Sequence, residues 1–290
     1  MSPRPRQGPR RVMHWILIAS FLAVVVYALR VSRVVESLAF YAPSRAAFGT
    51  PEGIEDVQIP SRRGGSLHGW WVPAADGAQR RGTVLFCHGN AGNLPDHIAF
   101  VRGLPEAGFD VLLFDYAGFG RSPRPRRIHR DSLLRDAEDA YRYLVETRGI
   151  DPQALFLHGH SMGGVTAIRL AALEGVSVAR IAAVAPFASF PRVAADHAGP
   201  IGWLLIDGRG AAERAVEALD PSEHLLLIHG DADRIVPSYH SERLADAASK
   251  ADVECTTRII PDADHVDVFD PPHDANRTVI EHFLSGQRGP

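Results

Sequence analysis

The sequence predicts an α/β fold built on a doubly wound, mostly parallel sheet. From residue 53 onward, apolar runs of strand length alternate with longer stretches of helical composition. The central runs, such as Leu225–Ile228, are apolar throughout, which is typical of strands buried on both faces of a parallel sheet. Strands that alternate with helices form right-handed βαβ units, and such units build a doubly wound sheet.

The predicted elements follow one another without an internal repeat. The strands are expected at Asp56–Ile59, Leu67–Val72, Thr83–Cys87, Val111–Phe114, Ala154–His158, Ile181–Ala185, Leu225–His229 and Cys255–Ile260. The helices are expected at Leu94–Glu106, Asp131–Thr147, Met162–Leu173, Ser238–Ala248 and His273–Leu284. A chain of 290 residues with 46% hydrophobic content suits one large domain, which we place at residues 53–286.

Residues 12–31 are predicted to form a transmembrane signal-anchor. The run from Val12 to Leu29 holds no charged residue and approaches the length of about 20 residues that a membrane-spanning helix needs. A basic arm at residues 1–11 precedes it, which favours a cytoplasmic N-terminus and a catalytic domain on the outer, extracytoplasmic side. A cleaved signal peptide and a peripheral or core helix are the alternatives. Residues 32–52 are expected to be a linker.

Composition argues against nucleic-acid binding, because the formal net charge is −3 and the body of the chain has no basic stripe. The two cysteines, Cys87 and Cys255, lie in apolar strand-like runs. We expect buried free thiols there, since two cysteines make no disulfide framework.

Residues 187–224 lie between two predicted core strands and are rich in glycine and proline. Ligands of open α/β sheets bind beyond the carboxyl ends of the strands, so an insertion at this point is expected to form a short cap over a pocket. A structural crossover helix is the alternative.

The stretch Gly159-His160-Ser161-Met162-Gly163 is the strongest chemical signal. It follows an apolar strand and precedes a helical stretch, which is the context that G-x-S-x-G needs in order to present a nucleophilic serine. The turn forces the serine into a strained conformation, and glycines on either side let strand and helix approach closely. Ser161 is therefore the predicted nucleophile.

A serine hydroxyl needs a base to accept its proton and an acid to orient that base. In this architecture they arrive in the order serine, acid, histidine, on loops after successive strands. Asp233 follows the strand Leu225–His229, and His265 follows the last strand. We predict the triad Ser161, Asp233 and His265, with Asp231 as the competing acid.

The oxyanion of an acyl-transfer reaction needs two preorganised donors. The backbone N–H of Met162 is expected to be one, because it directly follows the nucleophile at the start of a helix. The backbone N–H of Asn90, in the loop His88–Asn93, is expected to be the other. A plain glycine-rich turn is the alternative for that loop.

Other polar motifs carry weaker signals. His88 and His229 are expected to be structural hydrogen-bonding residues at strand ends, and His160 is expected to flank the pocket without acting as base. The turn Asp115–Ser122 lacks the third glycine and the helix of a dinucleotide site. We expect no cofactor and no metal, because the spacing of histidines, cysteines and acidic residues matches no common metal site.

Four motifs together resemble the α/β-hydrolase superfamily over roughly residues 50–285 and, more narrowly, its membrane-anchored BEM46-like branch of ABHD13-type and ABHD17-type serine hydrolases. They are His88–Asn93, Asp115–Ser122, Gly159–Gly163 and His229–Pro237. The resemblance implies a Ser–Asp–His hydrolase with an N-terminal membrane segment and no cofactor. The chain has His160, Ala117 and Val266 where that branch usually has Arg, Arg and Asn.

The leading functional hypothesis is a membrane-anchored serine hydrolase that cleaves an ester or thioester through an acyl-enzyme on Ser161. Its partners would be a small-molecule or lipid-like acyl substrate and the membrane. A serine peptidase or amidase with the same triad is one alternative. A catalytically idle membrane binding protein is the other.

Overall fold

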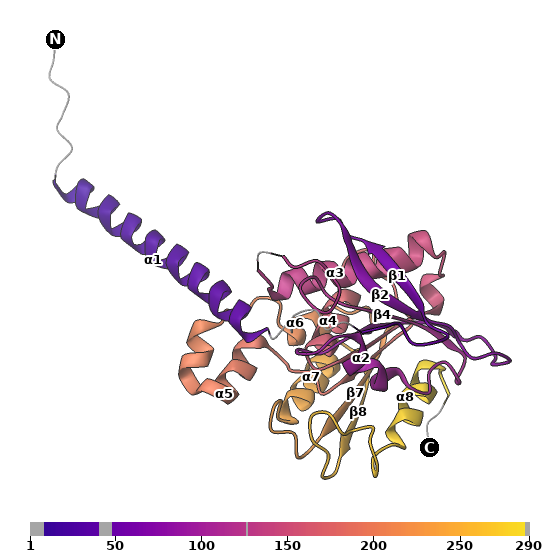
Figure 1. The fold of residues 1–290 in the computed structure, drawn as a ribbon. Helices are drawn as coiled ribbons and strands as arrows, with labels where there is room; N and C mark the ends of the chain where they lie inside the picture. Colours follow the sequence, from indigo (N-terminus) through magenta and orange to yellow (C-terminus); the bar gives the residue numbers. More distant parts are fainter. Residues whose placement is uncertain (1–8, 41–47, 126, 288–290) are drawn as a thin grey trace.

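A single eight-stranded sheet forms the centre of the computed structural model, which describes residues 9–40, 48–125 and 127–287 (Figure 1). The strand order is β1-β2-β4-β3-β5-β6-β7-β8. The pairs β1–β2 and β2–β4 are antiparallel, and all other neighbours are parallel. The predicted α/β fold with a mostly parallel sheet is confirmed.

Every predicted strand is present. The strands are β1 (Glu55–Pro60), β2 (Ser66–Val72), β3 (Gly82–Cys87), β4 (Phe109–Phe114), β5 (Leu155–His160), β6 (Arg180–Val184), β7 (His224–Gly230) and β8 (Glu254–Ile260). The central strands β3 to β7 are buried almost throughout, whereas the edge strand β8 is mostly exposed. A strand covered on both faces must be apolar on both faces. This is why continuous apolar runs in the sequence predicted the positions of these strands.

Helices cover both faces of the sheet. All the described helices are α1 (Pro9–Ala39), α2 (Leu94–His97), α3 (Arg130–Arg142), α4 (Met162–Ala171), α5 (Phe190–Leu205), α6 (Ala212–Val216), α7 (Tyr239–Lys250) and α8 (Asn276–Leu284), with short helical turns at Ile98–Val101, Tyr143–Thr147 and Pro152–Ala154, and of these α1 and α5 do not lie on the sheet. One hydrophobic core packs α3, α4, α6 and α7 against the sheet, and a second packs α2 and α8 against the other face.

The helix predicted at Leu94–Glu106 is shorter than expected. After α2 and the turn Ile98–Val101 the chain leaves the helical conformation, and Gly103 has a φ of +95°. Its Cβ, if present, would lie 2.3 Å from Glu281 Oε1. The Glu281 carboxylate is the end of a flexible side chain that can move aside, but the positive φ favours glycine. A single helix across residues 94–106 is therefore wrong.

The N-terminal helix α1 extends away from the body (Figure 1). It continues to Ala39, past residue 32, where the linker is expected to begin. Large apolar side chains between Met13 and Val25 are exposed. Within the portion of the chain that is described, no helix has both the length and the hydropathy needed to cross a membrane. The predicted span at residues 12–31 is thus unsupported, and the side chains of residues 12, 26 and 28–31 lie outside that portion.

The segment 187–224 contains α5 and α6. Helix α5 is kinked at Gly199, which has a φ of +57°, and Pro200 follows it. Beyond the kink, Leu204 is 83% exposed and Ile201 is also exposed. Figure 1 shows α5 projecting from the body beside the end of α1, and contacts join the two helices.

The two cysteines differ. Cys87 is fully buried, and burial raises the pKa of its thiol to about 12, whereas Cys255 on β8 is only partly buried. The expectation of buried thiols therefore holds for Cys87 and is wrong for Cys255, because β8 is the sheet edge.

Candidate active site

Ser161 occupies a strained turn between β5 and α4. Its φ is +54° and its ψ is −119°, outside the regions that L-residues favour. The backbone N–H of Ser161 donates to Val184 O at 2.7 Å, which ties the turn to β6. This hydrogen bond to the neighbouring strand stabilises the strained backbone conformation of Ser161.

Two glycines allow this turn because there is no room for a side chain at either. A Cβ on Gly163 would lie 1.9 Å from Cys87 O, and one on Gly159 would lie 2.4 Å from Gly163 O. Both contacts are with backbone atoms, which cannot move aside without displacing β3 or α4. The close approach of strand and helix expected from the sequence is present.

Asp233 and His265 meet beyond the carboxyl ends of β7 and β8. His265 Nδ1 lies 2.7 Å from Asp233 Oδ2, and both residues are buried. Asp231, the competing acid, is exposed and accepts a hydrogen bond from Asp262 N at 2.7 Å. The geometry therefore pairs His265 with Asp233.

Asp233 is held as a carboxylate. Its Oδ1 accepts hydrogen bonds from the backbone N–H groups of Ile235 and Val236 at 2.8 Å each. Burial raises its pKa, but hydrogen bonds from His229 and His265 outweigh burial and hold the pKa well below its usual range. His265 then donates from Nδ1, which leaves Nε2 as the nitrogen that can accept a proton.

His229 contacts the proposed catalytic acid, a role that was not predicted from the sequence. Its Nε2 lies 2.7 Å from Val236 O and 3.2 Å from Asp233 Oδ2, and its Nδ1 lies 2.7 Å from Ser241 Oγ. Its expected role as a strand-end hydrogen-bonding residue is present, but one of its partners is the proposed catalytic acid. The spacing of four residues between His229 and Asp233 across a tight turn is the signal that could have indicated this.

His160 joins the serine turn to the histidine loop. Its Nε2 donates to His265 O at 2.9 Å, and its ring stacks on Phe100 with centroids 4.1 Å apart. Burial and the neighbouring His265 hold the pKa of His160 well below its usual range. A neutral imidazole that donates from Nε2 has a bare Nδ1, so His160 positions the loop of His265 rather than taking part as a charged group.

The two proposed oxyanion donors follow the neighbouring parallel strands β5 and β3. Met162 is buried and is the first residue of α4, where a backbone N–H has no partner within the helix. Asn90 lies in the loop after β3, between Gly89 and Ala91, which has a φ of +69°. The side chain of Asn90 is exposed and donates from Nδ2 to Ala39 O of α1 at 2.9 Å.

The loop of Asn90 packs closely against the serine turn. A Cβ on Gly89 would lie 2.9 Å from Nδ1 of His160. His88 Nδ1 lies 2.7 Å from Gly89 O, and burial lowers the pKa of His88 to about 3. Neutral, buried histidines thus frame the loop. Across the residues described, no group of three or more His, Cys, Asp or Glu side chains could hold a metal ion.

Comparison with known proteins agrees with this architecture. A family model described as "alpha/beta hydrolase fold" matches residues 82–201. The uncharacterized protein YfhR of Salmonella typhi is 32% identical over 276 residues, which covers 91% of each chain. The Pyrococcus furiosus esterase Pf2001 superposes with a TM-score of 0.69 at 19% identity, over 87% of this chain and 98% of the esterase.

A puromycin-hydrolyzing peptidase of Mycobacterium tuberculosis superposes with a TM-score of 0.64 at 19% identity, over 84% of this chain and 41% of the peptidase. At 19% identity, the similarity to these two solved structures supports the fold alone. The sheet order, the strained serine turn, the family model and the full-length similarity to YfhR agree with one another. The chain belongs to the α/β-hydrolase superfamily.

Proposed function

We propose that this protein is a serine hydrolase that cleaves an ester or thioester through an acyl-enzyme on Ser161. The observation that carries the proposal is the buried Asp233 carboxylate on Nδ1 of His265, together with a strained serine turn whose residue His160 donates to His265 O. A carboxylate in this place fixes the tautomer of the base and stabilises its protonated form. The same arrangement has no evident use in a passive binding protein.

The reaction follows from these positions. His265 Nε2 accepts the Ser161 proton as Oγ attacks the acyl carbon, and the backbone N–H groups of Met162 and Asn90 donate to the resulting oxyanion. The intermediate collapses, and His265 returns the proton to the departing alcohol or thiol. A water molecule then attacks the acyl-enzyme with His265 again as base, and the carboxylic acid leaves while Oγ regains its proton.

A fluorophosphonate probe tests the nucleophile, because it phosphonylates only an activated serine. We expect the full chain in detergent to be labelled at Ser161 and the Ser161→Ala variant to remain unlabelled. Hydrolysis of p-nitrophenyl esters should fall in parallel, to the residual level that oxyanion donors and binding alone support. A wild-type chain that is folded yet neither labelled nor active would exclude the proposal.

A peptidase or amidase with the same triad is the second candidate. It is supported by the structural likeness to the puromycin-hydrolyzing peptidase, as the first candidate is by the likeness to esterase Pf2001. Panels of p-nitrophenyl acyl esters and aminoacyl amides separate the two, since a peptidase would show the larger kcat/KM on the amides.

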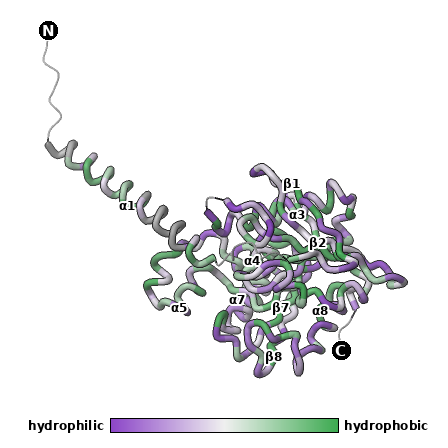
Figure 2. Tube along the Cα trace, viewed as in Figure 1, coloured by the Kyte–Doolittle hydropathy of each residue, from purple (hydrophilic) through white to green (hydrophobic). Residues whose placement is uncertain are grey.

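We also propose that α1 attaches the chain to a membrane, with the catalytic domain on the extracytoplasmic side and a small or lipid-like acyl compound as substrate. Support comes from the consecutive exposed residues of α1 between Met13 and Val25, which are mostly apolar on every side of the helix (Figure 2). A helix that is apolar all round needs an apolar environment. Membrane fractions should retain the chain after a carbonate wash, and protease accessibility of a C-terminal tag in oriented vesicles reports the side.

A further inference from the structure

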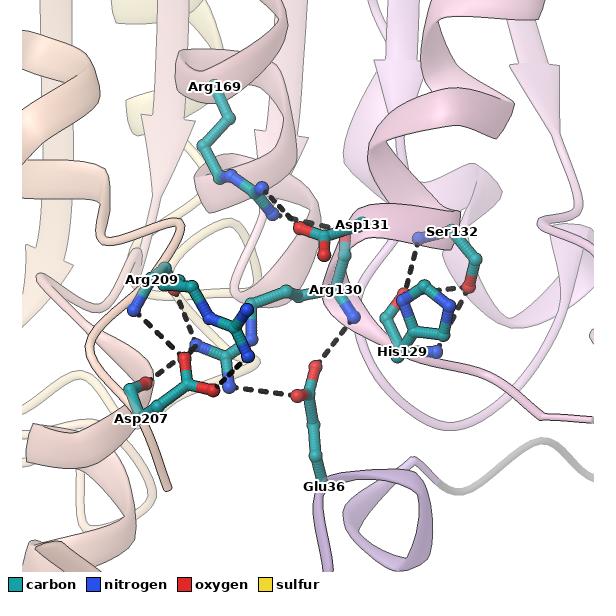
Figure 3. Close-up of polar contacts among 8 residues, drawn as sticks. All are labelled: Glu36, His129, Arg130, Asp131, Ser132, Arg169, Asp207 and Arg209. Atoms are coloured by element: carbon teal, nitrogen blue, oxygen red, sulfur yellow. Dashed lines mark hydrogen bonds and ion pairs between the residues drawn. The ribbon is translucent and has the colours of Figure 1, made fainter. Parts of the chain in front are cut away.

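A buried ion pair joins α1 to the hydrolase body at a distance in sequence from the triad. The Glu36 carboxylate accepts from the Arg130 backbone N–H at 2.6 Å and from its guanidinium at 2.8 Å (Figure 3). The side chains are only 5% and 3% exposed. A buried charge is costly unless it is fully paired, so each residue depends on the other.

Arg130 also holds both ends of the segment that carries α5. Its guanidinium donates to Asp207 O at 2.8 Å and to Arg209 O, both after α5, and it lies over the ring of Phe190 at the start of α5, 4.6 Å from the ring centroid. Asp207 Oδ1 lies 3.4 Å from the same guanidinium. Figure 3 shows Arg130 between Glu36 and this loop. The loop 207–210 after α5, which is the base of the predicted cap and is called the cap base below, is therefore fastened to α1 through one side chain.

A second connection runs from Arg130 toward the nucleophile. Arg169 of α4 donates to Arg130 O at 3.0 Å and to Asp131 Oδ1 at 3.1 Å. Helix α4 begins directly after Ser161. A Cβ on Gly210 would lie 2.7 Å from the Arg169 guanidinium, so the cap-exit loop also packs on this arginine.

The last turn of α1 reaches the proposed oxyanion loop as well. Ala39 O, three residues after Glu36, accepts the side-chain N–H of Asn90 at 2.9 Å. The position of this loop decides where the backbone N–H of Asn90 points. One helical turn thus contacts the proposed oxyanion loop directly and the cap base through Arg130.

We propose that the Glu36–Arg130 pair positions the active site, acting through the cap base and through the loop of Asn90. Neither residue touches the reacting atoms. This inference rests on the proposed hydrolase function. The attachment of α1 would then determine the position of Ser161 relative to the acyl carbon. A shift of about 1 Å between reacting groups can lower the rate about a hundredfold.

The test uses the full chain in detergent and four variants. Glu36→Gln and Arg130→Met each break the pair, and the double variant Glu36→Leu with Arg130→Met replaces it by apolar groups. Glu146→Gln is the control, because it breaks the exposed pair Arg142–Glu146 on the surface. For each variant we measure Tm, the fraction of sites labelled by a fluorophosphonate, and kcat and KM per labelled site on p-nitrophenyl butyrate and decanoate.

We expect Glu36→Gln and Arg130→Met to lower kcat/KM per labelled site about tenfold or more, with the larger loss on decanoate, whereas Glu146→Gln leaves it unchanged. The double variant should regain the Tm, since apolar replacement removes the buried charges, but not kcat/KM. Recovery of both would show a purely structural pair and overturn the proposal, as would a Glu36→Gln variant with unchanged kcat/KM per labelled site.

Asn90→Ala keeps the proposal open to test if the pair variants do not fold. It deletes the bond to Ala39 O but keeps the backbone N–H of residue 90. We expect kcat to fall several-fold with KM unchanged, and an unchanged kcat would refute the link from α1 to the oxyanion loop. If the wild-type chain is neither labelled nor active, the hydrolase proposal itself is wrong. If the wild type is active and the variants are unaffected, only the positioning role of the Glu36–Arg130 pair is wrong.

Discussion

At the scale of single residues, the surroundings of Asp233 separate it from its near neighbour. Asp233 is buried and bonded to His265, whereas Asp231, two residues earlier, is exposed and caps the backbone of Asp262. The two carboxylates are alike in sequence position and chemistry. Only the tertiary structure, through the turn after β7, decides which of them faces the base.

Asp233→Asn should lower kcat on an acyl ester by about 10³ to 10⁴-fold, because the amide would hold His265 in the wrong tautomer. The ionised carboxylate also stabilises the folded state, because its pKa is held low, so Tm should fall at neutral pH and activity is compared per folded protein. Asp231→Asn is the matched control and should retain most of the activity. If steady-state kinetics showed the larger loss for Asp231→Asn, the proposed acid would be wrong.

Glu223, before β7, makes stability depend on pH. Burial raises the pKa of its carboxyl to about 7, above the ordinary value of 4.5, so the folded state binds the proton more tightly than the unfolded state. The stability gained from the protonated form is complete below about pH 4.5 and is lost as the pH rises through about 7.

A glutamine at this position does not titrate. Glu223→Gln should therefore have a Tm roughly 2 °C higher than the wild type at pH 8, and the difference should shrink at pH 5. Scanning calorimetry at both values checks it, with the exposed Glu217→Gln as control. A gain in Tm that is larger at pH 5 than at pH 8 would contradict the assigned cause.

At the scale of secondary-structure elements, the start of α4 offers a matched pair of glycines. A Cβ on Gly163 would overlap the backbone of β3, whereas one on Gly164 would lie 3.2 Å from Gly159 O and 3.3 Å from the Cβ atoms of Ala183 and Pro186. The first contact admits no relaxation, and the second needs shifts of a few tenths of an ångström. Alanine also favours the helix by about 1 kcal/mol relative to glycine.

Gly163→Ala should thus abolish soluble expression or lower Tm strongly, while Gly164→Ala should fold with a Tm close to that of the wild type. Fluorophosphonate labelling of Ser161 should survive only in the second variant. Thermal unfolding of the two variants, prepared in parallel, gives the two Tm values to be compared. Equal tolerance of the two substitutions would mean that the strand and the helix lie further apart than the structure has them.

The elements also show what the sequence could predict and what it could not. Buried parallel strands such as β5 and β7 carry their environment in a continuous apolar run, so each was predictable to within a few residues. The end of the helix predicted at residues 94–106 was not, because Leu104 continues the apolar pattern although the backbone is already extended at Arg102. Likewise, Glu36 is the only acidic residue among the first 45 of the sequence, and only its contact with Arg130, far away in the chain, explains its burial.

At the scale of the whole molecule, the apolar part of α1 extends away from the body (Figure 2). Its large apolar side chains between Met13 and Val25 are exposed, whereas most apolar side chains of the body are buried. Exposed patches of this size favour association in water. We therefore expect the full chain to self-associate in buffer without detergent or lipid. Light scattering should fall when detergent is added above its micelle concentration, and equal scattering with and without detergent would contradict this expectation.

The continuity of α1 also limits how far the active site can move. An unbroken helix of 31 residues rises about 45 Å from end to end, and its last turn is fastened by Glu36 to the body. A flexible tether of the same number of residues would let the enzyme search a sphere around its attachment point. A stiff arm clamped at one end instead gives Ser161 a nearly constant height above whatever holds the other end. Ser161 can reach acyl bonds that lie at this distance from the attachment point. Acyl bonds nearer to or further from that point are out of its reach.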